Sequence, residues 1–108
     1  MIIIEKYKGI KMDIDVCRKK EKINNFICAI TLINKGARDI RNIILDIYIP
    51  QEVELIRGEI QRQRGILDIE GEYKNLIIGN LVADEVAKVT LEVKAKEENT
   101  EIECYGVI

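Results

Sequence analysis

The sequence predicts an all-β fold, an antiparallel β-sandwich of seven to eight strands, with a small closed β-barrel as the alternative. Three observations predict it. Isoleucine fills 22 of the 108 positions, and its branched side chain packs best on an extended backbone. Apolar and polar side chains alternate with period two through most segments, as they do in half-buried strands. Gly, Asn and Pro residues separate these segments at intervals of about 8–12 residues, which is typical of sandwich strands.

Each predicted strand follows from this alternation and from the turn residue that ends it. Met12, Ile14 and Val16 mark a half-buried strand. The segment 26–33 is apolar on both faces except at Thr31, which suits a central strand covered on both sides. Further strands are predicted at 43–49, 53–56, 66–69, 73–78, 87–96 and 102–108, with 2–7 as an additional candidate. The residues predicted to form turns are Asn34, Gly36, Pro50, Gly58 and Gly79.

The chain, residues 1–108, is predicted to form a single domain, because its length suits one hydrophobic core. No internal repeat, low-complexity tract or linker divides it. One charged residue, Asp46, stands inside an apolar strand. We expect its carboxylate to face solvent, with the capping of a neighbouring turn as the alternative.

The composition removes several classes of active site. The chain has no His, Ser or Trp, so it can hold no Ser–His triad, Cys–His pair or Cys₂His₂ zinc site. Paired strand carboxylates such as Asp13 and Asp15 supply too few oxygens for calcium and are interpreted as solvated. We therefore expect no enzymatic activity, no catalytic residue, no metal site and no cofactor.

Charge and hydropathy limit the kinds of partner that we expect for this chain. The 17 Lys and Arg residues nearly balance 19 Asp and Glu residues, whereas nucleic-acid binding normally needs a basic excess. No stretch approaches the roughly 18 apolar residues of a membrane span, and segment 1–6 lacks the features of a signal peptide. We expect no nucleic-acid partner, no membrane span and a cytoplasmic location as written, or the cell surface if the chain belongs to a longer exported protein.

The three cysteines, Cys17, Cys28 and Cys104, are an odd number without a C-x-x-C spacing. The simplest interpretation is buried or half-buried free thiols. One disulfide with a thiol left over is the alternative, and a three-thiolate metal site is disfavoured.

Three segments stand in a recognisable order. They are 30–37, which ends in Asn-Lys-Gly-Ala; 40–50, which ends in Ile-Pro; and 78–81, Ile-Gly-Asn-Leu, followed by alternation through Val93. Together, over about residues 23–96, they resemble the conserved-repeat immunoglobulin-like domains of bacterial and archaeal surface proteins, the DUF11-like and CARDB-like group. The resemblance implies an immunoglobulin-like antiparallel β-sandwich that serves as a structural, spacer or adhesive module without catalytic residues.

Two segments are candidates for contact with a partner. Arg57, Arg62 and Arg64 lie in or beside the polar segment 59–64, where guanidinium groups can bind a phosphate or an acidic partner; a solvated loop is the simpler interpretation. Ile102, Tyr105 and Val107 belong to the last predicted strand. At a sheet edge, that strand could pair with a strand from a partner, with pairing inside the sandwich as the simpler interpretation.

The sequence is compatible with two functions. The first is a non-catalytic immunoglobulin-like structural or protein-interaction module. The alternative is an accessory or regulatory domain that docks on an enzyme or on a secretion or surface assembly. We also expect self-association, because so many isoleucines leave apolar surface that a small domain does not cover.

Overall fold

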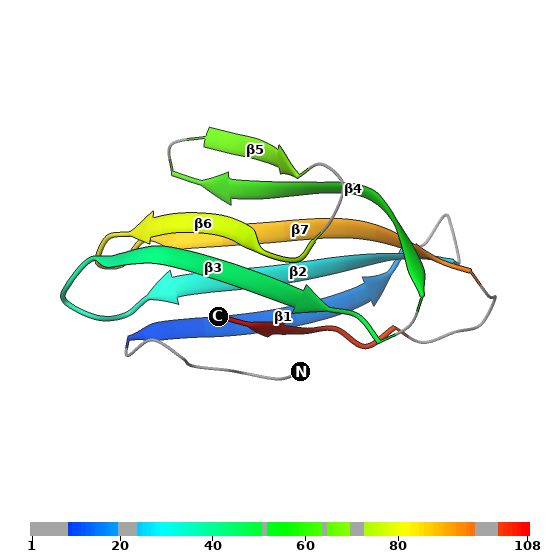
Figure 1. Ribbon diagram of the computed structural model, residues 1–108, viewed down its shortest axis with the longest axis horizontal. Coiled ribbons are helices and arrows are strands. Elements are labelled where there is room, and N and C mark those ends of the chain that lie inside the picture. The colour runs from blue at the N-terminus through cyan, green and yellow to red at the C-terminus, as the bar shows by residue number, and fades with distance from the viewer. Residues whose placement is uncertain (1–8, 20–23, 51, 64, 70–72, 97–101) are drawn as a thin grey trace.

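Eight strands form two antiparallel sheets, which confirms the predicted all-β sandwich (Figure 1). The computed structural model describes residues 9–19, 24–50, 52–63, 65–69, 73–96 and 102–108. These ranges contain no helix and therefore none that could span a membrane. Each sheet is open, so the barrel alternative is wrong.

The large sheet has five strands and the small sheet has three. The order in the large sheet is β1 (Ile10–Arg18), β2 (Asn25–Asn34), β7 (Val86–Ala95), β4 (Val53–Arg62) and β5 (Gly65–Ile69). The order in the small sheet is β6 (Leu76–Leu81), β3 (Ile40–Tyr48) and β8 (Tyr105–Val107). The predicted strands therefore all have a counterpart among the described residues, except the candidate at 2–7, which lies outside them.

The chain passes repeatedly from one sheet to the other. Along the described strands it changes sheet five times: between β2 and β3, β3 and β4, β5 and β6, β6 and β7, and β7 and β8. Strand β2 pairs with β7, and β3 pairs with β8. Each sheet is thus held together by pairings between strands that are distant in the sequence.

The core lies between the inner faces of the two sheets. Alternate residues of most strands point into it, because successive side chains of a strand face opposite sides; β5 has no fully buried residue. The fully buried members of the core include Ile30, Leu32, Leu45, Ile47 and Leu91. Burial of one such side chain contributes roughly 1.5–3 kcal/mol, so the isoleucine-rich alternation supplies the main stabilisation of the fold.

The prediction that Gly58 ends a strand is wrong. Strand β4 runs through Gly58 to Arg62, and the segment interpreted as a polar loop pairs with β5 and β7. A side chain at position 58 would come within 2.8 Å of Leu91 Cδ2 and 3.1 Å of Ile69 Cβ. Glycine therefore makes room here for side chains of the two neighbouring strands of the same sheet, and it does not break the strand.

The prediction that Gly79 ends a strand is also wrong. It lies inside β6, where the pairing of Ile43 with Gly79 is flanked by register shifts, and its φ is 84°. A left-handed backbone of this kind is easy for glycine and marks an irregularity within the strand. The predicted start at residue 73 is too early, because residues 73–75 bend and Asn75 has a φ of 54°.

Candidate interaction surface

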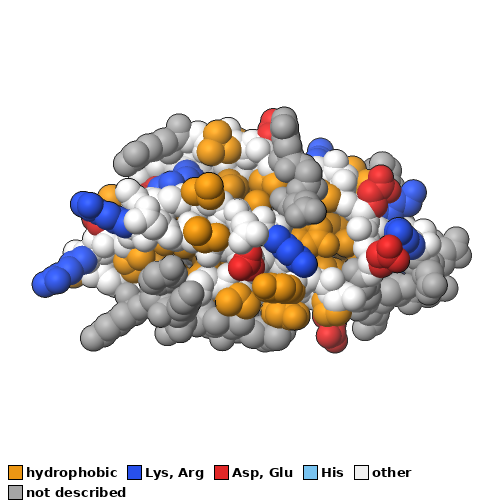
Figure 2. Space-filling view, in the orientation of Figure 1, with side chains coloured by type: hydrophobic (Ala, Val, Ile, Leu, Met, Phe, Trp, Pro, Cys, Tyr) orange, Lys and Arg blue, Asp and Glu red, His pale blue; other side chains and the backbone are white. Residues whose placement is uncertain are grey.

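The outer face of the small sheet carries exposed apolar side chains from all three of its strands. Ile44 of β3 and Ile77 of β6 are partners in register and are 47% and 75% exposed. Val107 of β8 is 37% exposed. With Tyr48 and Tyr105 on the same side of the sheet, these residues form what we call the tyrosine face. Figure 2 shows hydrophobic side chains spread over this face of the molecule.

The two tyrosines form a stacked pair at one end of the tyrosine face. Tyr48 and Tyr105 are partners in register, and their ring centroids lie 5.3 Å apart with an angle of 13° between the ring planes. The Nζ atom of Lys74 lies 5.4 Å from the Tyr48 ring centroid, within the range of a cation–π contact. Stacked tyrosines present a large, rigid contact area, which is why tyrosine is enriched in protein interfaces.

Asp46 lies on the outer face of β3, between Ile44 and Tyr48. Its Oδ1 atom accepts a hydrogen bond of 2.7 Å from the backbone N–H of Asn75. The alternative raised for this residue, the capping of a neighbouring turn, is therefore confirmed, while its side chain remains half-buried. The carboxylate holds the 73–75 bend against β3, so it positions Lys74 beside the tyrosines.

The outer face of the large sheet is different in character. Its described side chains include charged and polar groups at alternate positions along β1 and β7, among them Lys11, Asp13, Asp15, Lys88, Thr90 and Lys94. These groups keep that face compatible with water. The large sheet also carries exposed apolar side chains, at Ile56, Ile66, Leu67 and Val86. What distinguishes the small sheet is that its three strands combine exposed apolar side chains with a stacked tyrosine pair.

A buried carboxylate interrupts the polar face of the large sheet. The Glu92 side chain is only 3% exposed and accepts hydrogen bonds from Asn25 Nδ2 at 2.8 Å and Lys19 Nζ at 3.0 Å. Arg57 Nε lies 3.1 Å from Glu92 Oε1. The hydrogen bonds from Asn25 and Lys19 hold the pKa of the Glu92 carboxyl below its usual range, against the opposing effect of burial.

This Glu92 cluster joins four segments of the large sheet and borders a cavity of about 330 Å³, which Gly58, Glu59, Asp68 and Thr90 also line. Nothing in the sequence pattern singled it out, because Glu92 occupies an ordinary outward position of an alternating strand. The outward position of one isoleucine at 43–44 and at 77–78 could have been predicted from the sequence. Ile44 and Ile77 each belong to an Ile-Ile pair, and one member of such a pair in a strand must face outward.

The three candidate arginines have different positions. Arg57 lies on β4 at a register shift, with its side chain 72% exposed and its Nε bound to Glu92. Arg62 ends β4, and its side chain is 19% exposed. Arg64 lies outside the described residues. The solvated-loop interpretation is wrong for Arg57 and Arg62, since both belong to a strand that pairs on two sides.

Arg62 connects the two sheets at the edge of β6. Its Nη1 donates to the carbonyl oxygen of Ile78 at 2.8 Å, and its Nη2 donates to that of Asn80. Its Nη2 also binds Glu85 Oε2 at 2.7 Å, while Glu85 Oε1 accepts from Val82 N–H at 3.0 Å. Most of the guanidinium is thus engaged within the fold.

The three candidate residues of the last strand also separate. Tyr105 and Val107 belong to the tyrosine face, whereas Ile102 is 7% exposed and packs in the core. Strand β8 pairs with β3 on one side and ends the order of the small sheet. Beside it, a cavity of about 410 Å³ opens between β1 and segment 102–105, lined in part by Ile14, Val16 and Cys104.

The described residues bring exposed apolar side chains together on the tyrosine face. No three Cys, Asp or Glu side chains among them gather in a way that could hold a metal ion. No protein-family model, no curated protein and no solved structure matches the chain. The functional argument therefore rests on the tyrosine face and on the way the strands present it.

Proposed function

We propose that this chain is a non-catalytic immunoglobulin-like interaction module that associates with a second copy of itself through the tyrosine face. The observation that carries the proposal is the tyrosine face: five apolar or aromatic side chains on one side of a three-stranded sheet, three of them exposed by more than a third. Exposed apolar surface of this kind usually marks an interface.

The interlocked strand order supports the immunoglobulin-like part of the proposal. In immunoglobulin sandwiches, the second and fifth strands pair in one sheet and the third and sixth pair in the other. Here β2 pairs with β7, and β3 pairs with β8, with the chain crossing between the sheets at the equivalent points. The resemblance to conserved-repeat surface domains points the same way, because its motifs fall on β2, β3, β6 and β7.

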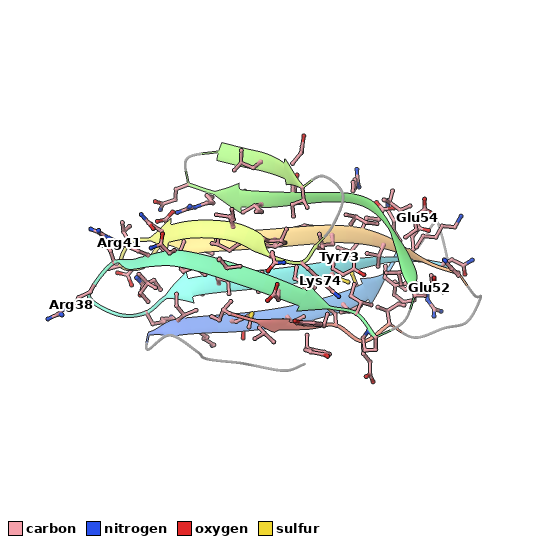
Figure 3. All side chains as sticks on the ribbon, viewed as in Figure 1. Arg38, Arg41, Glu52, Glu54, Tyr73 and Lys74 are labelled. Carbon is pink, nitrogen blue, oxygen red and sulfur yellow. The ribbon has the colours of Figure 1, made fainter. Side chains whose placement is uncertain are left out.

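Charge supports a second copy as the occupant. Figure 3 shows Arg38 and Arg41 at one end of the long axis and Glu52 and Glu54 at the other. When two copies pack face to face about a two-fold axis perpendicular to the long axis, Arg38 and Arg41 of one lie over the end of the other that carries Glu52 and Glu54, where Lys96 also pairs with Glu52 at 2.9 Å. Such an arrangement buries both tyrosine faces and brings opposite charges together at the rim.

Analytical ultracentrifugation of the full chain tests this proposal. We expect a concentration-dependent dimer. We expect Ile77→Lys to weaken dimerisation by about tenfold or more, because it places a charge at the most exposed apolar side chain of the tyrosine face. Leu67→Lys on β5 is the matched control: Leu67 is 66% exposed, but it lies outside the tyrosine face. A chain that stays monomeric at high concentration, or a dimer that Leu67→Lys weakens as much as Ile77→Lys does, would contradict the proposal.

The second candidate is an accessory or regulatory domain that docks on an enzyme or on a secretion or surface assembly. Among the described strands, β8 pairs on one side only and lies next to the cavity of about 410 Å³. This favours docking, because an edge strand can pair with an extended segment of a partner. In that case the backbone of β8 is the docking element. Substitutions on the tyrosine face away from β8, such as Ile77→Lys, then leave binding unchanged.

A further inference from the structure

Two of the three thiols meet in the core, one on each side of the sandwich. Cys28 lies on the inner side of β2 in the large sheet and is fully buried. Cys104 directly precedes β8 of the small sheet and is 8% exposed. Both side chains belong to the same hydrophobic core cluster, and each shifts the pKa of the other. Cys17, in contrast, is exposed, on the opposite side of β1 from the buried Ile14.

The two thiols differ in their access to a cavity. Cys104 lines the cavity of about 410 Å³ beside β1, whereas Cys28 is not among its lining residues. Val16, the register partner of Cys28, also lines that cavity. Residues 102–104 precede the paired part of β8, so Cys104 can move toward Cys28 without breaking strand pairing.

We propose that a peroxide oxidises Cys104 and that Cys28 then closes a disulfide with it, which links the two sheets through the core. In the first step, the Cys104 sulfur attacks hydrogen peroxide; the O–O bond breaks, a sulfenic acid forms and water leaves. In the second step, the Cys28 sulfur attacks the Cys104 sulfur, the S–O bond breaks and a second water leaves. Two thiols and one peroxide thus give one disulfide and two waters.

The acid–base properties of the pair agree with this order. The hydrogen bond with Cys104, together with burial, raises the pKa of the Cys28 thiol above its usual range. The same hydrogen bond, donated by Cys28, lowers the pKa of Cys104. The thiolate is the reactive form of cysteine, so the thiol that lines the cavity is also the one that ionises first.

Mass spectrometry of the full chain tests the proposal. The folded protein is treated with hydrogen peroxide, then denatured and alkylated. We expect one alkylated thiol in place of three, a mass lower by two hydrogens before alkylation, and a digest fragment that joins Cys28 to Cys104. We also expect the oxidised chain to unfold on the order of 10 °C higher, because the bond closes a long loop of the unfolded chain.

Single substitutions distinguish the roles of the three cysteines. Cys17→Ala is the matched control and must retain the Cys28–Cys104 bond. In Cys28→Ala, the sulfenic acid on Cys104 has no thiol to resolve it, so a dimedone probe should label Cys104; in Cys104→Ala, Cys28 should stay unlabelled. The wild-type digest does not depend on how the variants fold. Three alkylatable thiols after oxidation, a bond that involves Cys17, or a bond that lowers the unfolding temperature would each overturn the proposal.

Discussion

Asn34 is fully buried, and its side chain makes three hydrogen bonds at the end of β2. Its Nδ2 donates to the carbonyl oxygens of Arg38 at 2.8 Å and Leu81 at 3.0 Å, and its Oδ1 accepts from Gly36 N–H at 2.9 Å. The amide thus holds the turn after β2 and the end of β6 at once. A carboxylate of the same shape can accept from Gly36 but cannot donate to either carbonyl.

Asn34→Asp is therefore expected to destabilise the fold by about 2–4 kcal/mol, because it leaves two carbonyl groups without a donor and buries a charge. Urea unfolding at neutral pH measures the change. The control is Asn80→Asp: Asn80 Oδ1 accepts from Asn42 N–H at 3.1 Å, and an aspartate keeps that bond. Its effect should stay within about 0.5 kcal/mol. Equal losses in the two variants would show that the donated bonds do not matter.

The sequence made Asn34 recognisable only in part. Its place between an apolar strand and Gly36 predicts a turn residue, and the structure confirms that. Its second bond reaches Leu81, 47 positions away, and no local pattern reveals a contact that depends on how two sheets stack. The buried hydrogen bonds of Glu92 did not emerge from the sequence for a related reason: they depend on which distant strands pair within the large sheet.

At the scale of elements, the alternation of apolar and polar residues predicted where the strands lie, whereas the boundaries predicted from glycines were wrong. Strand β4 continues through Gly58 because Leu91 and Ile69 fill the space of its missing side chain. Period-two patterns depend on the pleat alone and can be predicted locally. Whether a glycine ends a strand or admits a neighbouring side chain depends on the strands that pair with it, here β5 and β7, which the local sequence does not contain.

Strand β6 illustrates how an edge is held. It ends the order of the small sheet, and the Arg62 guanidinium donates to its carbonyl oxygens at Ile78 and Asn80. Arg62→Met keeps the apolar stem but removes these bonds and the contact with Glu85. We expect a loss of about 1–3 kcal/mol and faster hydrogen–deuterium exchange in peptides from 76–81.

The matched control for Arg62→Met is Arg41→Met, which removes an exposed guanidinium near the start of β3. Exchange in 76–81 should then match that of the parent chain. If both variants exchange alike in this segment, Arg62 does not hold the edge of β6.

For the whole molecule, the two outer faces separate two tasks. In the proposed dimer, the tyrosine face of the small sheet meets a second copy, while the Glu92 cluster ties together the large sheet behind it. Glu92 of β7 contacts Arg57 of β4, Asn25 of β2 and Lys19, which follows β1. Its ionised form is therefore coupled to the global stability of the fold and not to the binding face.

That coupling predicts how stability depends on pH. The pKa of Glu92 is lowered in the folded protein, whereas an unfolded glutamate titrates near about 4.3. The unfolded chain thus binds the proton more readily, so the contribution of Glu92 is complete above about pH 5 and is lost as the pH falls through its lowered pKa. At neutral pH, Glu92→Gln should cost about 1–3 kcal/mol, measured by urea unfolding, and the difference from the parent chain should shrink steadily toward pH 2.

Glu54→Gln, at an exposed position of β4, should show no such pH-dependent difference. A gap between Glu92→Gln and the parent chain that is equally large at pH 7 and pH 2 would mean that Glu92 stabilises the sheet by its shape and not by its charge.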